Sequence, residues 1–190
     1  MHTALLHNNY VIKPQGLSIA GKFRAYDPHN EAVLFSDQKT RWSAPFSTIR
    51  VCTDDKRKQE LLLIQDSKHH ENAYFYDVTD SVSGEQVGVV GVDWTNFFED
   101  AWQIMDAQGT VIGHVRETGT GRAILHGLTD GLVTQNLNII VGETVVAELR
   151  QKNAMIGHVL RVDFNMDGGK LDRRLGLAIA FIVAGHQGSE

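Results

Sequence analysis

The chain has 190 residues, of which 42% are hydrophobic and 22% are charged, and its formal net charge at pH 7 is −5. A chain of this length can bury one hydrophobic core, so we expect a single domain spanning residues 1–190. The acidic balance gives the molecule as a whole no electrostatic reason to bind nucleic acid, and we predict no nucleic-acid partner. Any contact with an acidic membrane surface would have to be local.

The N-terminal residues and the cysteine content both bear on the cellular compartment. The first residues, MHTALLHNNYVIK, contain neither a basic region nor a sustained apolar run, so they are unlike a secretion signal. Cys52 is the single cysteine, and it cannot form an internal disulfide. We therefore expect a cytoplasmic location.

Four segments repeat one arrangement: a strand-like run, a turn rich in Asp, Gly or Asn, and a second strand-like run. They are FRAYDPHNEAVLFSD (23–37), AYFYDVTDSVSGEQVGVVGV (73–92), AWQIMDAQGTVIGHVRE (101–117) and LNIIVGETVVAELRQ (137–151). Each predicts a β-hairpin. Gly109 stands where the third hairpin needs a left-handed bulge residue, and Gly142 stands first in the fourth turn, as a type II′ turn requires. We expect further strands at Tyr10–Ile12, Thr48–Cys52, Glu60–Gln65 and His158–Phe164.

The chain ends in a long apolar segment, LDRRLGLAIAFIVAG, which predicts a helix over about 171–185. From Leu175 to Gly185 there is no charged residue, and a helix of that length extends only about 16 Å. The hydrocarbon core of a bilayer is about 30 Å thick, so the segment is too short to span it. A helix that is apolar on all sides and too short for a membrane is normally surrounded by protein.

The hairpins and the helix together predict the fold class, which is mainly β. Many antiparallel hairpins leave exposed sheet edges unless the sheet closes, and a closed barrel of ten or more strands is too wide for its own side chains to fill. We therefore expect a closed antiparallel barrel around the buried C-terminal helix. Arg173 and Arg174 should lie at the barrel mouth, with their charges in water. The helix residues that we expect to be buried are Leu175, Leu177, Ile179, Phe181, Ile182 and Val183.

The segments YDVTD…GEQVGVV, WQIMDAQGTVIGHVRE and VDFNMDGGKLDRRLGLAIAFIV resemble the tubby C-terminal-like superfamily, in particular its LURP-one-related and phospholipid scramblase branch. The resemblance runs from about Tyr10 to Ala184 and lies in the order of elements. It implies a barrel of roughly twelve strands around a central hydrophobic helix. Tubby domains bind phosphoinositides through basic surface residues, scramblases are linked to calcium-dependent lipid movement, and LURP-one-related proteins are linked to plant defence. The proline-rich N-terminal segment and cysteine cluster of scramblases are missing here.

The position of the scramblase calcium loop reads DFNMDGGKLD, just before the final helix. Carboxylate and amide oxygens at alternate positions, followed by glycine, are typical of the first half of an EF-hand-type loop. The twelfth position is Arg174, so a shorter loop would have to be closed by Asp172. The resemblance therefore implies a weak calcium site, while the alternative is a polar turn in which Asp172 is favoured by the helix dipole. The candidate calcium ligands are Asp163, Asn165, Asp167 and Asp172.

Two other segments could contact lipid. Trp94, Phe97, Phe98 and Trp102 have helix-like spacing, which is compatible either with insertion into a lipid interface or with packing on the barrel wall. Basic residues occur at 56–58, beside acidic ones, and as Arg150 and Lys152 at a strand end. A run of mixed sign is usually a solvated turn.

No catalytic motif is recognisable, so we expect a protein that is not an enzyme. The chain has no HExxH pair, no GxSxG, no P-loop and no GxGxxG after a strand. Two functions remain. The first is a scramblase-like or LURP-one-related barrel that binds membrane phospholipid or phosphoinositide peripherally. The second is a cytoplasmic protein-interaction or scaffold barrel with no lipid role.

Overall fold

The computed structural model describes residues 1–15, 21–41, 44–70, 73–93, 102–118, 136–153, 158–165 and 170–186. Twelve antiparallel strands form a closed barrel in the order β1-β12-β11-β10-β9-β8-β7-β6-β5-β4-β3-β2. The first six strands are β1 (Asn9–Pro14), β2 (Lys22–Tyr26), β3 (Ala32–Arg41), β4 (Ala44–Cys52), β5 (Glu60–His70) and β6 (Ala73–Asp80). The others are β7 (Gln86–Asp93), β8 (Trp102–Met105), β9 (Val111–Glu117), β10 (Asn136–Val141), β11 (Thr144–Asn153) and β12 (His158–Phe164). The predicted fold class and all the predicted strands are confirmed.

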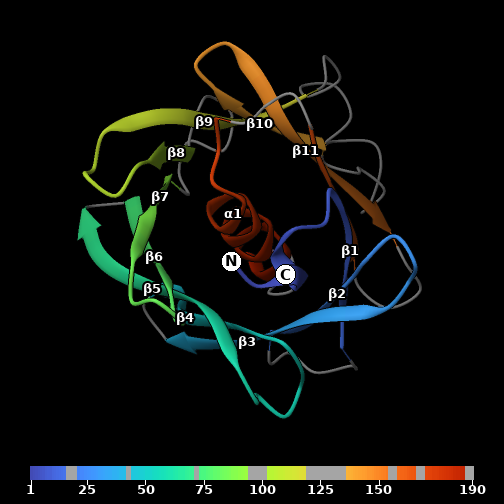
Figure 1. Ribbon diagram of the computed structural model, residues 1–190. Coiled ribbons are helices and arrows are strands. Elements are labelled where there is room, and N and C mark those ends of the chain that lie inside the picture. Colours follow the sequence, from blue (N-terminus) through green and yellow to red (C-terminus); the bar gives the residue numbers. More distant parts are fainter. Residues whose placement is uncertain are drawn as a thin grey trace, which may run out of the picture.

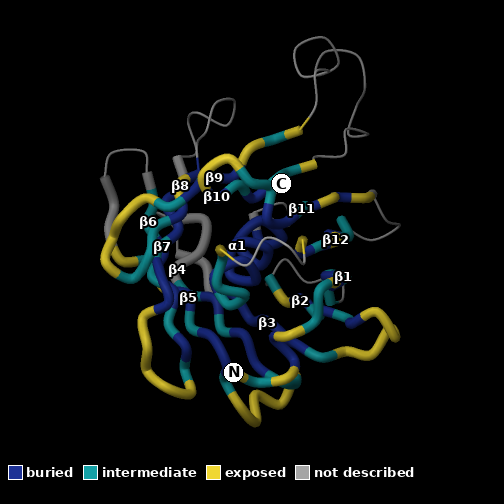
Figure 2. The backbone as a smooth tube through the Cα atoms, turned by 45° about the horizontal axis from the view of Figure 1, so that its top comes forward, coloured by how far each residue is buried: buried dark blue, intermediate teal, exposed yellow. Residues whose placement is uncertain are grey.

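The helix α1 (Arg173–His186) runs through the barrel, and Figure 1 shows it enclosed by the ring of strands. The six helix residues predicted to be buried are each at most 2% exposed. In Figure 2 the buried residues of the helix and the strands are dark blue, and the exposed residues of the hairpin turns are yellow. Among the described residues, none of the helices is both long and apolar enough to cross a bilayer.

The strands place alternate side chains inside and outside the barrel. Along β12, Leu160 and Val162 are at most 3% exposed and face the helix, whereas Arg161 between them is exposed. The helix fits closely into this interior: a Cβ built on Gly176 would lie 2.5 Å from Cε1 of Phe164. Gly176 is therefore needed for the close approach of α1 to β12.

Four hairpin turns share a similar hydrogen-bond arrangement, and three of them lie in the repeated segments of the sequence. Each turn opens with an aspartate whose Oδ1 accepts two backbone N–H groups, at 2.8 to 3.2 Å. These aspartates are Asp27, Asp54, Asp80 and Asp106. Later in each turn the backbone adopts a positive φ, at Asn30 (62°), Arg57 (55°), Gly84 (74°) and Gly109 (80°). The left-handed conformation predicted for Gly109 is confirmed, and Gly142 also has a positive φ, of 60°.

The N-terminal residues lie against the start of α1. The short 3₁₀ helix η1 (Thr3–Leu5) buries Leu5, and the hydroxyl of Tyr10 donates to the carbonyl of Ala4 at 2.9 Å. Burial raises the pKa of Tyr10 to about 12, against the smaller opposing effects of a hydrogen bond from the backbone of His7 and of the charge on Arg173. The hydroxyl therefore keeps its proton at neutral pH and remains a donor.

Candidate anion-binding face

The predicted calcium ligands lie near the entry of α1, and the described ones each contact protein groups. Asp163 accepts a hydrogen bond from Nδ2 of Asn9 at 2.5 Å, and the backbone N–H of Asn165 donates to Val146 at 2.9 Å. Asp172 uses both carboxylate oxygens to bind Arg174. Asp167 lies outside the described residues. Within the described part of the chain, no group of three or more His, Cys, Asp or Glu side chains could hold a metal ion, and the calcium site stays a prediction.

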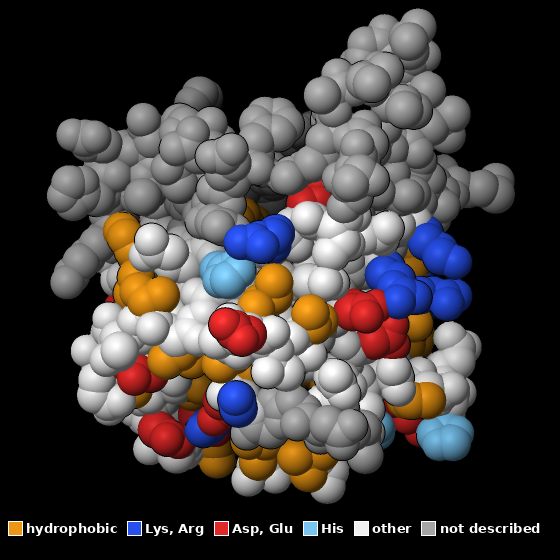
Figure 3. All heavy atoms as spheres, turned by 90° about the horizontal axis from the view of Figure 1, so that it is seen from above, with side chains coloured by type: hydrophobic (Ala, Val, Ile, Leu, Met, Phe, Trp, Pro, Cys, Tyr) orange, Lys and Arg blue, Asp and Glu red, His pale blue; other side chains and the backbone are white. Residues whose placement is uncertain are grey.

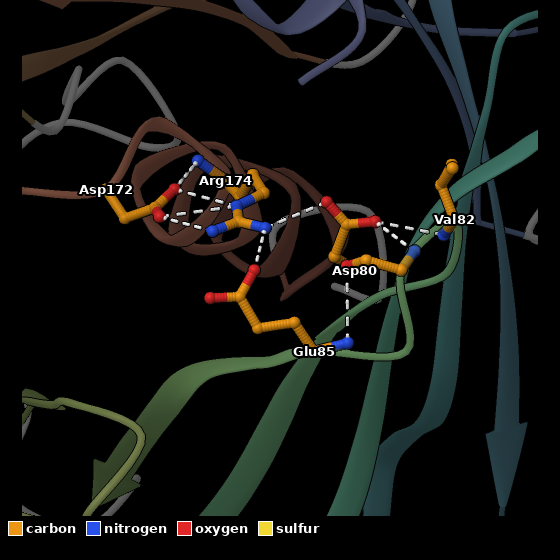
Figure 4. Close-up of polar contacts among 6 residues, drawn as sticks. Asp80, Val82, Glu85, Asp172 and Arg174 are labelled. Carbon is orange, nitrogen blue, oxygen red and sulfur yellow. Dashed lines mark hydrogen bonds and ion pairs between the residues drawn. The ribbon is translucent and has the colours of Figure 1, made fainter.

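The largely buried side chain of Arg174 lies at the centre of an ion cluster, shown in Figure 4. Its Nη1 lies 2.8 Å from Oδ2 of Asp80 and 2.7 Å from Oε2 of Glu85, and its Nη2 lies 2.7 Å from Oδ2 of Asp172. Its side chain is only 11% exposed, so the prediction that its charge lies in water is wrong. The β6–β7 turn places Asp80 and Glu85 over the barrel mouth, a contact between distant segments that sequence spacing does not reveal.

The cluster joins the start of the helix to the barrel wall. Asp172 is the N-cap of α1, since its Oδ1 accepts the backbone N–H of Arg174 at 2.9 Å. Hydrogen bonds, the first of them to Asp172, raise the pKa of Arg174 above its ordinary value despite burial, so the guanidinium stays charged. Desolvation alone would raise the pKa of Asp80, but the hydrogen bonds from Arg174, Ser83 and Val82 and the charge of Arg174 together lower it.

The lowered pKa of Asp80 predicts a loss of stability in acid. A carboxyl whose pKa is lower in the folded state stabilises the fold above its unfolded-state pKa of about 3.9, and this contribution disappears as the pH falls through the folded-state value. We expect the free energy of unfolding of the wild type to fall as the pH drops below about 5. The free energy of unfolding of the Asp80→Asn variant should fall less steeply. Urea denaturation at a series of pH values measures both slopes, and equal slopes would contradict the role of Asp80.

The four strands β11, β12, β1 and β2 carry a row of basic side chains on their outer face. Strand register places Arg150 of β11 directly opposite Arg161 of β12, and Lys13 of β1 directly opposite Arg24 of β2. Like charges directly opposite each other destabilise a sheet, so two such pairs on adjoining strands of an acidic protein are unexpected. We call this set the basic face; it comprises Lys13, Lys22, Arg24, Arg150, Lys152 and Arg161.

Some charges of the basic face have no counterion among the described residues. Within the described part of the chain, the exposed side chains of Lys22, Lys152 and Arg161 form no ion pair. Lys13 lies over the ring of Tyr26, 4.6 Å from its centroid. The face therefore presents positive charge to solvent, beside a directly opposed acidic pair, Glu148 and Asp163, on the same side of β11 and β12; the whole chain has a net charge of −5.

A polar depression of about 470 Å³ borders the basic face at β10 and β11. It is lined by polar and charged residues together with two leucines: Thr118, Asn136, Leu137, Asn138, Glu148, Leu149 and Arg150. Figure 3 shows the outer side of the barrel over β9 to β11, where blue basic side chains gather at the right beside red acidic ones. Such a surface can bind an anionic group that also carries hydrogen-bond acceptors.

The sequence indicated only part of this face. Arg150 and Lys152 were recognisable as a basic strand end, but Arg161 lies on the next strand, and Lys13 and Arg24 are far away in the chain. Knowledge of the register of β1 with β12 and of β11 with β12 would have been needed to find them. The basic residues at 56–58 lie in the β4–β5 turn, as the mixed charges indicated. Trp102, of the aromatic cluster, is 6% exposed in β8, and the other three aromatic residues lie outside the described residues.

The fold and this face define a closed β-barrel that holds its own C-terminal helix and carries a basic outer surface. No family model, curated protein or solved structure matches the chain.

Proposed function

We propose that this protein is a non-enzymatic, cytoplasmic barrel that binds anionic phospholipid surfaces peripherally through the basic face. The observation that carries the proposal is the direct cross-strand pairing of Arg150 with Arg161 and of Lys13 with Arg24. An anionic surface placed over these strands would neutralise the repulsion within each pair. Each Lys or Arg near such a surface contributes about 1 kcal/mol to binding.

The proposal also includes membership of the tubby C-terminal-like superfamily, in its LURP-one-related and phospholipid scramblase branch. The resemblance of the sequence segments supports it, and a closed barrel around a hydrophobic C-terminal helix is the architecture that this resemblance implies. The polar lining of the depression beside Arg150 suits phosphate-bearing headgroups, because they accept hydrogen bonds. Calcium held by Asp163, Asn165, Asp167 and Asp172 belongs to the same proposal.

Reversal of one charge on the basic face tests lipid binding. Arg161→Glu removes a positive charge and adds a negative one, so we expect roughly 30-fold weaker binding to vesicles of phosphatidylcholine and phosphatidylserine. The variant should fold, since Glu opposite Arg150 replaces a like-charge pair by an opposite-charge pair. Vesicle sedimentation, with and without calcium, measures the affinity. Vesicles of phosphatidylcholine alone measure the binding that does not depend on negatively charged lipid.

The matched control is Lys170→Glu, which makes the same charge change at an exposed residue beside the entry of α1. We expect this control to bind nearly as well as the wild type. Equal losses in the two variants would mean that binding follows net charge and not the basic face. No sedimentation with anionic vesicles, either by the wild type or by variants in which the acidic side chains paired with the basic face are neutralised, would reject the lipid role and favour the alternative, a protein-interaction or scaffold barrel.

A further inference from the structure

Two arginines of the basic face already hold carboxylates of the chain itself. Nη2 of Arg24 lies 2.5 Å from Oδ2 of Asp55, and Arg150 forms an ion pair with Glu148. All four side chains are between 33% and 55% exposed. Exposed ion pairs of this kind are weak, because water and salt compete with them. Each can therefore be exchanged for an external anion.

The β4–β5 turn delivers Asp55 to Arg24 but does not depend on that contact for its shape. Within the turn, Oδ1 of Asp54 accepts the backbone N–H groups of Lys56 and Lys58, at 3.0 and 3.2 Å. Arg57, with its positive φ of 55°, forms a separate ion pair with Asp37 of β3. Asp55 can thus leave Arg24 while the rest of the turn stays in place.

We propose that Asp55 and Glu148 are internal competitors, which occupy Arg24 and Arg150 until a phosphate-bearing membrane surface displaces them. This inference rests on the proposed function and concerns its regulation. Phosphate groups present more oxygens than a carboxylate and form bidentate hydrogen bonds with guanidinium groups, so they can displace a side chain that is held only by an exposed ion pair. Asp55 and Glu148 then set how much negative charge a membrane surface must carry before the barrel binds to it.

Removal of the competitors should tighten binding. Asp55→Asn and Glu148→Gln each release one arginine, and we expect each to increase the affinity for phosphatidylserine-containing vesicles about fivefold, the effect of one additional basic residue at such a surface. Glu143→Gln makes the same charge change at an exposed residue that is not on the basic face, and it should alter the affinity much less. A melting curve for each variant checks that the fold is retained.

A double-mutant cycle separates competition from a general charge effect. If Asp55 acts by occupying Arg24, then Asp55→Asn should have no further effect in a protein that already carries Arg24→Gln. An increase of the same size in both backgrounds would overturn the proposal, as would equal effects of Asp55→Asn and Glu143→Gln. Inorganic phosphate added as a soluble competitor distinguishes the source of the anion: inhibition at low concentration would show that free phosphate, and not the lipid surface, is the preferred ligand.

The same measurements keep this inference separate from the proposed function. Binding by the wild type without any gain in the Asp55 and Glu148 variants would leave the lipid role intact and reject internal competition. Binding by the variants where the wild type fails to bind would support both ideas, with Asp55 and Glu148 holding the face inactive. Failure of wild type and variants alike would reject the proposed function itself.

Discussion

Ala180→Asp should prevent the chain from folding. Ala180 lies in the middle of α1 and is fully buried inside the barrel. A carboxylate there would have no partner among the apolar side chains around the helix, and an unpaired buried charge costs several kcal/mol or forces the group to take up a proton. Because a domain is typically stable by only about 5–15 kcal/mol, we expect aggregated or unfolded protein on expression.

Ala32→Asp is the matched control for this prediction, because Ala32 is exposed at the start of β3. It makes the same chemical change outside the core, and we expect soluble protein with a melting temperature close to that of the wild type. Soluble expression and thermal melting measure both variants. A soluble Ala180→Asp protein with an unchanged melting temperature would show that α1 does not need its apolar surroundings.

Arg174→Met should be the most destabilising change at the barrel mouth, by about 3–5 kcal/mol. The methionine keeps much of the side-chain volume but leaves the carboxylate of Asp80, which is 10% exposed, without its cation. Asp172 would lose the same partner while it remains the N-cap of α1. The free energy of unfolding from urea denaturation is the measurement.

Two further variants test the cause of this loss. Arg173→Met removes a guanidinium that binds the neutral oxygens of His7 and Asn8, so we expect a smaller loss than for Arg174→Met. Adding Asp80→Asn to Arg174→Met should recover part of the stability, because the amide oxygen can still accept the backbone N–H groups of Val82 and Ser83 without a buried charge. If this double variant is less stable than Arg174→Met alone, an uncompensated charge on Asp80 is not the cause.

Local sequence signals specify the elements and the fold class of this protein. Three signals in the sequence are local: alternating apolar residues, aspartates at the start of turns, and the turn glycines Gly109 and Gly142. Each reflects the backbone conformation of a few neighbouring residues. The helix was predicted over 171–185 and is found at Arg173–His186, starting after its N-cap Asp172. Its burial also followed from local information, since a short segment that is apolar on every side has no stable place in water.

Which charged side chains meet depends on contacts between distant parts of the chain. Arg174 contacts Asp80 although 94 residues separate them in the chain, and Arg150 lies opposite Arg161 through the register of β11 and β12. A shift of that register by one residue would exchange the inner and outer faces of a strand, and nothing in the local sequence around Arg161 specifies its partner. Closure of the barrel sets these registers, because in a closed ring every strand must pair with both of its neighbours while its apolar side faces the same interior.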